Sequence, residues 1–129
     1  MEIPPFPQDG AALARFQREG PFIWLWEYTG TACVLGAGTP LADVDLSSCA
    51  AAGVPVYRRR GGGGAVLLSP GNLIITACYD ARRKAFPTQW IGPIAEAVAR
   101  ALRALGLHSA CVQGLGDVAV GSRKVLGSS

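Results

Sequence analysis

The hydrophobic positions of this chain follow two patterns, which together predict a mixed α/β protein. Short apolar runs bounded by turn-forming residues are typical of strands, and they fall at residues 22–28, 31–35, 54–57, 65–68 and 73–78. Apolar residues spaced three and four apart are typical of helices, and they fall at residues 9–19, 45–52 and 88–105. We expect an α/β fold of the α+β type, in which helices pack against a mixed, largely antiparallel sheet.

Capping residues set the limits of the predicted helices. Asp9 is expected to cap the first helix, and Asp43 or Asp45 the second. Gly20 ends the first helix, and the polar stretch at 80–87 is a connection. The third helix has an apolar stripe that is expected to face the core, made of Ile91, Ile94, Val98, Ala101 or Leu102, and Leu105.

Turn residues between the apolar runs predict two hairpins in the first part of the chain. Thr29-Gly30 is expected to join the run at 22–28 to the run at 31–35. Pro70-Gly71 has the residues that the centre of a type II turn prefers, and it is expected to join the runs on either side of it.

A third hairpin is predicted at the end of the chain, where Gly121-Ser122 suits a two-residue type II′ loop. This register pairs Ala119 with Lys124 and Val118 with Val125, and places Asp117, Ala119, Lys124 and Leu126 on one face. The valines are expected to face the core. Lys124 would lie diagonal to Asp117, about 7–8 Å away. A strand lysine near a carboxylate suits a phosphate ligand, and an exposed hairpin lysine is the alternative.

Composition narrows the class of protein. The chain has 129 residues, 50% of them hydrophobic and 16% charged, which suits one folded domain and argues against disorder. The net charge of +3 does not call for nucleic acid but suits an anionic small molecule. No signal peptide and no apolar run long enough to span a membrane is seen. We therefore expect a cytoplasmic protein without a membrane partner.

The cysteines do not indicate a metal site. Cys33, Cys49, Cys78 and Cys111 contain no pair with the C-x-x-C spacing of zinc sites. All four fall within expected strands or a helix, where buried and inert cysteine is the usual case.

A run of arginines and glycines is the most informative stretch of the chain. Three arginines at 58–60 precede four glycines at 61–64, between two apolar runs. Glycines let successive backbone amides form a concave anion site, and arginines add forked cationic donors. A flexible loop with a solvated basic flank is the alternative. The loop leads into a strand, which excludes a P-loop or a Rossmann turn. Gly36-Ala37-Gly38 lacks the third glycine of a dinucleotide turn.

Two motifs in this order resemble the catalytic domain of the lipoate–protein ligases, in the biotin/lipoate ligase superfamily. The family carries R-R-x-x-G-G-G-A-V followed by a G-N turn, matched here by residues 58–66 and by Gly71-Asn72. It also carries an N-D pair followed by K-x-x-G-S, matched by Gly116-Asp117 and by residues 124–128. The resemblance covers nearly the whole chain, and implies that residues 1–129 are the N-terminal portion of such a catalytic domain.

The resemblance implies an enzyme that uses ATP and magnesium to convert lipoate to lipoyl-AMP. The acyl group then passes to a lysine of a lipoyl carrier domain, either in a 2-oxoacid dehydrogenase or in a glycine cleavage H-type protein. Lys124 is the implied catalytic residue, and Asp117 holds magnesium or the nucleotide. Trp26 lines the tunnel for the acyl chain or, alternatively, belongs to the core. The remaining implied adenylate-binding residues are Arg58, Arg59, Gly61, Gly62, Gly63, Gly64, Ala65, Gly71 and Asn72.

Three departures from the family pattern leave alternatives open. Leu68-Ser69 stand where the family has His-Asp, and Gly116 stands where it has asparagine. The chain also stops just after the lysine motif, where the family's domain continues. A transferase of octanoyl or lipoyl groups that uses a cysteine nucleophile is one alternative. A remnant that binds lipoate or an adenylate without turnover is another. Biotin remains an alternative acid substrate.

Overall fold

The computed structural model describes residues 2–80, 82, 86 and 88–129, and the chain divides into two compact units, Met1–Asp80 and Ala81–Ser129. The first unit contains α1 (Pro7–Glu19), β1 (Phe22–Tyr28), β2 (Ala32–Leu35), a short 3-10 helix (Leu41–Asp43), α2 (Leu46–Ala51), β3 (Val56–Arg58), β4 (Val66–Leu68) and β5 (Asn72–Cys78). The second contains α3 (Thr88–Ala104), β6 (Ala110–Gln113), β7 (Asp117–Val120) and β8 (Arg123–Leu126). The predicted connection at 80–87 falls largely outside the described residues.

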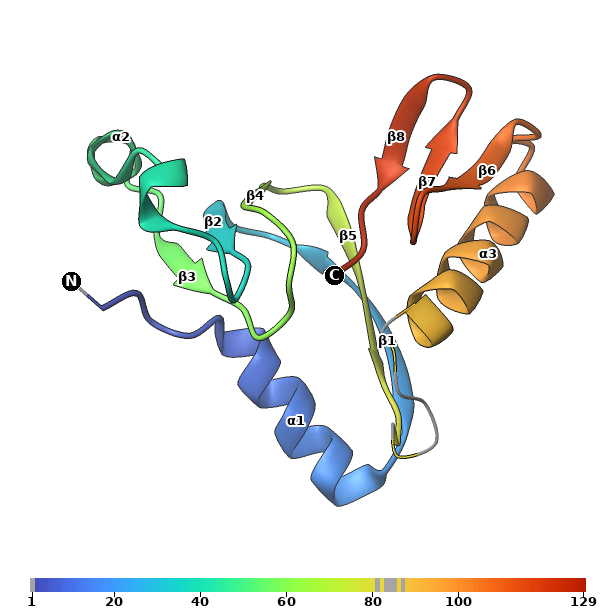
Figure 1. The fold of residues 1–129 in the computed structure, drawn as a ribbon, viewed down its shortest axis with the longest axis horizontal. Coiled ribbons are helices and arrows are strands. Elements are labelled where there is room, and N and C mark those ends of the chain that lie inside the picture. Colours follow the sequence, from blue (N-terminus) through green and yellow to red (C-terminus); the bar gives the residue numbers. More distant parts are fainter. Residues whose placement is uncertain (1, 81, 83–85, 87) are drawn as a thin grey trace. The chain divides into compact units, whose positions relative to one another are not determined.

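The first unit is built on an interrupted antiparallel ribbon (Figure 1). β1 pairs with β5 from Phe22↔Cys78 to Tyr28↔Asn72, and β2 pairs with β4 from Ala32↔Leu68 onwards. The two ladders share one register, because the step from Tyr28↔Asn72 to Ala32↔Leu68 covers the same number of residues on both sides. The chain segments 22–35 and 66–78 therefore run alongside each other.

The two hairpins predicted for this unit are wrong. β1 does not pair with β2, and β4 does not pair with β5. Pro70-Gly71 does form the predicted turn, with Gly71 at φ +91° and the Asn72 amide bonded to the Ser69 carbonyl. This turn and the Thr29-Gly30 segment lie opposite each other and interrupt the ribbon. Because the flanking strands pair with distant segments, local turn chemistry could not reveal their partners.

β3 adds a parallel strand to β2, and the N-terminal segment borders it through a bridge between Pro5 and Arg58. The core of this unit is formed by Phe6, Ala32 and Val34. The side chains of Tyr28, Tyr57 and Leu68 pack against them. The sheet and the N-terminal segment thus enclose a small aromatic core.

The caps of the first two helices follow the sequence only in part. α1 begins with Pro7 and has no side-chain cap, so the predicted capping role of Asp9 is wrong. Asp9 lies in the first turn of the helix, and its carboxylate accepts a hydrogen bond from the Arg60 amide at 2.6 Å. α2 is capped as predicted, because the Asp45 carboxylate accepts from the Ser48 amide at 3.0 Å.

In the second unit α3 packs against the sheet of β6, β7 and β8 (Figure 1). Ala95 and Ala99 on the helix are buried against Val118 on β7. Val98 and Leu102 also pack there, as the predicted stripe requires. Leu105 does not, because it is 81% exposed just beyond the helix end.

A β-bulge changes the predicted register of the last hairpin. Ala119 pairs with Lys124 as expected, but Val118 pairs with Leu126 and not with Val125. Val125 is the extra residue on β8 and is exposed, whereas Leu126 packs against the core. A bulge places two residues opposite one, and this reverses which side chain faces inward. Gly121 has φ +59°, as the predicted type II′ loop requires.

Across the described residues every strand ladder is antiparallel except the β2–β3 pair. The predicted mixed, largely antiparallel α/β fold is confirmed. Within the part of the chain that the structure describes, no helix has the length and apolar character needed to cross a membrane.

Candidate anion-binding site

The glycine run forms a loop in which each carbonyl oxygen accepts a hydrogen bond. The donors come from the turn after β2 and from Arg59. The bonds run from the Ala37 amide to Gly61 (2.8 Å), from Arg59 Nη2 to Gly62 (2.6 Å) and Gly64 (3.1 Å), from Thr39 Oγ1 to Gly63 (2.9 Å), and from the Gly36 amide to Gly64 (3.2 Å).

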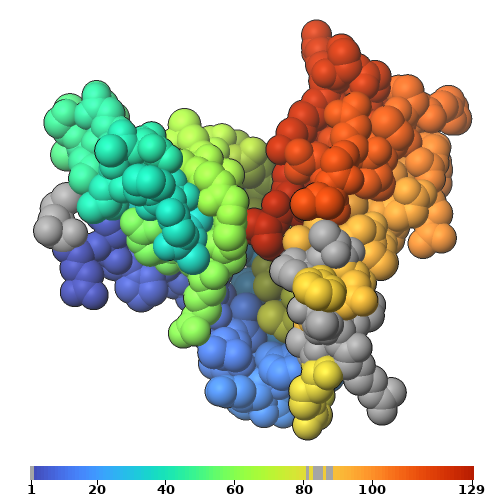
Figure 2. Space-filling view, in the orientation of Figure 1, coloured from blue at the N-terminus to red at the C-terminus, as the bar shows by residue number. Residues whose placement is uncertain are grey.

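These bonds determine where the loop amides point. In a trans peptide the N–H of the next residue points away from the carbonyl. The amides that follow the four bonded carbonyls belong to Gly62, Gly63, Gly64 and Ala65, and among the described residues none has an acceptor. The glycines from 62 onwards are exposed, and this yellow-green segment lies on the face of the first unit seen in Figure 2. The loop thus presents successive backbone donors, as anion-binding nests do.

The turn at residues 36–39 supports the loop, and the sequence interpretation did not include it in the site. A Cβ on Gly36 would overlap the Gly63 carbonyl oxygen, so only glycine allows the two segments to approach. Thr39 is the buried polar residue that bonds to that same carbonyl. The available signal was a G-x-G-T-P turn directly after a buried strand.

The two arginines of the motif hold these backbone segments in place. Arg58 Nη1 donates to the carbonyls of Gly36 (2.8 Å), Ala37 (3.1 Å) and Thr39 (3.0 Å). Arg59 Nη1 donates to the Val34 carbonyl at 3.1 Å. Burial lowers the pKa of the Arg59 guanidinium, and the nearby Asp9 charge opposes this effect. Direct contact of either arginine with a substrate stays a prediction.

Gly71 and Asn72 form the turn that interrupts the ribbon. The Asn72 side-chain oxygen accepts from the Ser69 amide at 2.7 Å and from the Ser69 hydroxyl at 3.2 Å. These bonds give the G-N pair a structural role in the turn, and its contact with an adenylate stays a prediction.

Side chains along β1 alternate between partly buried and exposed, and Trp26 lies on the partly buried face. Its ring stacks on Trp24 with centroids 5.0 Å apart, and its Nε1 donates to Thr76 Oγ1 at 3.1 Å. The side chain is partly buried. Trp24 and Trp26 thus form a wall of aromatic rings, and the acyl tunnel stays a prediction.

In the second unit, the structure brings Asp117 and Lys124 together. Lys124 Nζ lies 2.7 Å from Asp117 Oδ2, and the side chains are 60% and 40% exposed, respectively. Gly127 closes one side of the pair, because a Cβ there would lie 3.2 Å from Lys124 Cε and 3.3 Å from Nζ. Lys124 therefore carries an accessible ammonium group with a carboxylate partner.

The glycine at the family's asparagine position has a local explanation. A Cβ on Gly116 would overlap Ile91 Cγ2 and Ser128 Oγ. The Ser128 hydroxyl also donates to the Gly116 carbonyl at 3.0 Å. Ile91 and Ser128 therefore occupy the space into which a longer side chain at 116 would extend.

The described residues do not form a metal cage. Among them no group of three histidine, cysteine, aspartate or glutamate side chains is arranged to hold a metal ion. Asp117 is paired with Lys124. Magnesium is usually bound through one or two carboxylates together with substrate phosphates, so Asp117 alone fits it only in company with a nucleotide.

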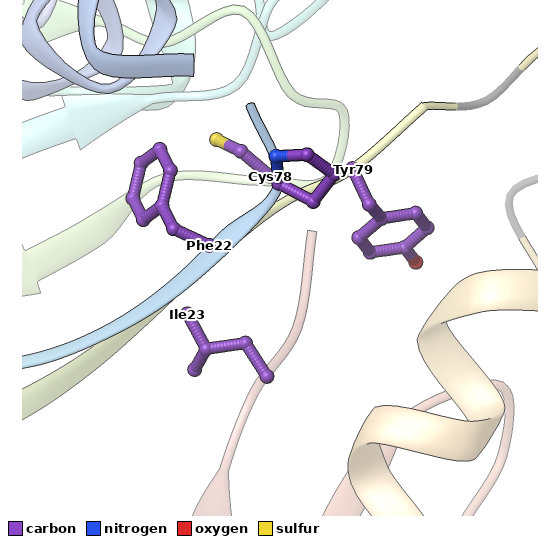
Figure 3. A pocket seen from close by; sticks show the side chains of 5 residues that line it. Phe22, Ile23, Cys78 and Tyr79 are labelled. Carbon is purple, nitrogen blue, oxygen red and sulfur yellow. The ribbon is translucent and has the colours of Figure 1, made fainter. Parts of the chain in front are cut away.

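Two of the four cysteines, Cys33 and Cys78, do not resemble activated nucleophiles. Burial raises the pKa of the Cys33 and Cys78 thiols. Cys78 lies opposite Phe22 at the end of the β1–β5 ribbon, in a shallow apolar pocket (Figure 3). Cys111 is exposed on β6, contrary to the expected burial.

Solved structures of similar fold include lipoate–protein ligases. The bi-partite ligase of Thermoplasma acidophilum, solved with its E2 lipoyl domain, has a TM-score of 0.77 and 24% identity over 96% of this chain and 50% of its own. P. falciparum LipL1 in complex with lipoate has a TM-score of 0.64 and 22% identity over 91% of this chain and 35% of its own. A lipoate-protein ligase A bound with ATP has a TM-score of 0.70 and 22% identity over 96% of this chain and 59% of its own.

These likenesses establish the fold, and this chain spans between about a third and three fifths of each of those proteins. No curated protein sequence matches the chain. Residues 8–129, nearly the whole chain, match the lipoyl protein ligase A/B catalytic domain. The chain therefore belongs to the family of the lipoyl protein ligase A/B catalytic domain.

Proposed function

We propose that this chain is the nucleotide-binding and acyl-activating part of a lipoate–protein ligase. The observation that carries the proposal is the row of backbone amides from Gly62 to Ala65, which are held outward without acceptors among the described residues. Such a row is suited to phosphate oxygens, whose developing charge it stabilises without reorganisation. The ATP and lipoate bound by similar structures support the same substrates here.

The proposed reaction has two steps. A carboxylate oxygen of lipoate attacks the α-phosphorus of ATP, the bond to the β-phosphate breaks, and pyrophosphate leaves. The amine of a carrier lysine then attacks the acyl carbon of lipoyl-AMP, and AMP leaves. Magnesium, when bound with the nucleotide, supplies charge neutralisation on the phosphates.

Within this proposal the loop, the Asp117–Lys124 pair and Trp26 have different roles. The loop amides bind phosphate oxygens. Lys124 exchanges its ion pair with Asp117 for the ligand, and there it neutralises negative charge on the α-phosphate and on the lipoate carboxylate. Trp26 and the ring stacked on it offer an apolar surface to the acyl chain. Neither step needs a nucleophile from the protein, which agrees with the raised pKa of Cys33 and Cys78.

Pyrophosphate release that depends on both lipoate and ATP tests the proposal. We expect Lys124→Ala to lower the rate at least about 100-fold, as removal of a group that stabilises transition-state charge does. Arg123→Ala is the matched control, because Arg123 is the adjacent exposed cation and has no proposed contact. If Lys124→Ala released pyrophosphate as fast as Arg123→Ala, Lys124 would have no role in the mechanism.

Gly62→Ala separates a ligand role of the glycine run from a structural one. A Cβ at Gly62 meets nothing within 4 Å, and its φ is not positive, so the variant is expected to fold normally. The same methyl group would stand where a phosphate approaches the loop. We therefore expect weaker ATP binding with an unchanged melting temperature.

Two alternatives give different results in the same assays. Octanoyl transfer from an acyl carrier that is blocked by a thiol reagent would indicate the transferase. Binding of lipoate or ATP without pyrophosphate release would indicate a binding protein without turnover.

A further inference from the structure

Thr39 lies outside the two motifs, and its hydroxyl, its amide and its carbonyl all form hydrogen bonds. Its hydroxyl donates to the Gly63 carbonyl at 2.9 Å, and its amide donates to the Gly36 carbonyl at 3.1 Å. Its own carbonyl accepts from Arg58 Nη1 at 3.0 Å. Thr39 is 8% exposed, and its bonds to Gly63 and Arg58 are partly buried. Each polar group of this residue is thus engaged with the loop or with its support.

The hydrogen bond from the Thr39 hydroxyl to the Gly63 carbonyl also sets the direction of the Gly64 amide, because both groups belong to the same peptide. Because the peptide is planar and trans, holding the Gly63 carbonyl toward Thr39 points the Gly64 amide away from it. Gly63 has φ +81°, and glycine allows many other backbone conformations. Without a fixed donor to the Gly63 carbonyl, the 63–64 peptide could rotate and withdraw that amide from an anion.

Arg58 holds Thr39 in place through hydrogen bonds to the backbone of residues 36–39. Its Nη1 bonds to the carbonyls of Gly36, Ala37 and Thr39 and so holds the turn that carries the Thr39 side chain. This links Arg58 to the glycine loop through Thr39. Arg58, the first residue of the motif, thus affects the orientation of the loop amides indirectly, through Thr39.

We propose that Thr39 is a positioning residue for the anion-binding loop, acting through the Gly63 carbonyl to keep the Gly64 amide directed at the ligand. The proposal rests on the proposed function, in which that amide contacts a phosphate. Thr39 itself does not touch the ligand, and a residue of this kind affects affinity through preorganisation of the donor.

The test compares Thr39→Val, which keeps the shape and removes the hydroxyl, with Thr39→Ser, which keeps the hydroxyl. ATP is titrated into the full 129-residue chain by calorimetry. We expect Thr39→Val to weaken binding about tenfold, because it leaves a carbonyl without its partner, and Thr39→Ser to stay within about twofold. Thr29→Val, which removes an exposed hydroxyl from the ribbon interruption, is the control and should bind normally.

Amide spectra of ¹⁵N-labelled chain give a readout that a general loss of stability would not produce. In Thr39→Val the Gly64 amide resonance should move and lose its response to ATP, while resonances of β6 to β8 stay in place. Thr39→Ser should restore both.

The outcomes distinguish the two proposals. ATP binding by Thr39→Val equal to that of the unaltered chain, with an unmoved Gly64 resonance, would overturn the positioning role alone. Failure of the unaltered chain to bind ATP would overturn the anion site, and the positioning role would fall with it.

Discussion

The glycine loop and the Asp117–Lys124 pair are both parts of the predicted site, yet the fold supports them by different means. The loop is held by a hydroxyl 24 residues away in sequence, by a partly buried arginine side chain and by two backbone amides. Among the residues that the structure describes, Lys124 forms an ion pair with one carboxylate, on the neighbouring strand, and both side chains are well exposed. The loop is therefore a rigid set of donors, and the lysine is a movable charge.

This contrast matters for how each part can act on a ligand. Fixed amides lose little entropy when an anion binds and need no rearrangement. An exposed ion pair contributes little to stability and can exchange its carboxylate for a phosphate at small cost. Substitutions that remove the support of the loop should consequently affect folding and binding together, whereas those at the pair should affect chemistry with little effect on folding.

Gly36→Ala should have the largest effect on stability. The new Cβ would overlap the Gly63 carbonyl oxygen. Because this oxygen belongs to the backbone, relieving the overlap requires the whole loop to shift. We expect a loss of about 2 kcal/mol or more in the free energy of unfolding, measured by denaturant titration.

Gly38→Ala is the matched control for this experiment. It lies in the same turn, a Cβ there meets nothing within 4 Å, and its φ is not positive. It should be neutral or slightly stabilising. A normal stability for Gly36→Ala would mean that the loop does not pack against this turn.

Gly116→Ala should have a smaller effect, because the overlapping atoms belong to the side chains of Ile91 and Ser128. We expect a loss of about 1–2 kcal/mol in the free energy of unfolding. Adding Ile91→Ala should relieve part of the overlap, so that the double variant loses less than the sum of the two single losses. Strict additivity would contradict the packing described here.

Lys124→Met should change stability by less than about 1 kcal/mol, because the ion pair with Asp117 is exposed. Asp117→Asn should behave alike, and added salt should reduce both differences. The measurement is the same denaturant titration. A loss above about 2 kcal/mol would show that the pair supports the fold, and the comparison with the loop would fail.

The smallest effect concerns cysteine labelling. Since burial raises the pKa of Cys33 and Cys78, less of each thiol is ionised at a given pH, and alkylation should rise only at higher pH. Peptide mass spectrometry after brief alkylation near neutral pH should find exposed Cys111 modified before both. Faster labelling of Cys78 would point to the transferase with a cysteine nucleophile.

The sequence by itself determined the features that depend on near neighbours. Most of the strand and helix segments, the Asp45 cap, the turn at Gly71 and the loop at Gly121 follow from residues a few positions apart. The order of the two motifs was enough to identify the family. Local backbone preferences and short-range hydrogen bonds act within one turn or strand, so their sequence signals are direct.

Only the tertiary structure decided which segments meet. Phe22↔Cys78 pairing replaced a local hairpin, a bulge at Val125 turned Leu126 toward the core, and Asp9 bonded to Arg60 in place of its own helix. Thr39 and Gly36 joined the site because the ribbon register and the packing of the loop bring residues 36–39 against residues 61–64. These outcomes depend on hydrogen bonds and packing between distant segments, whose energies no short stretch of sequence contains.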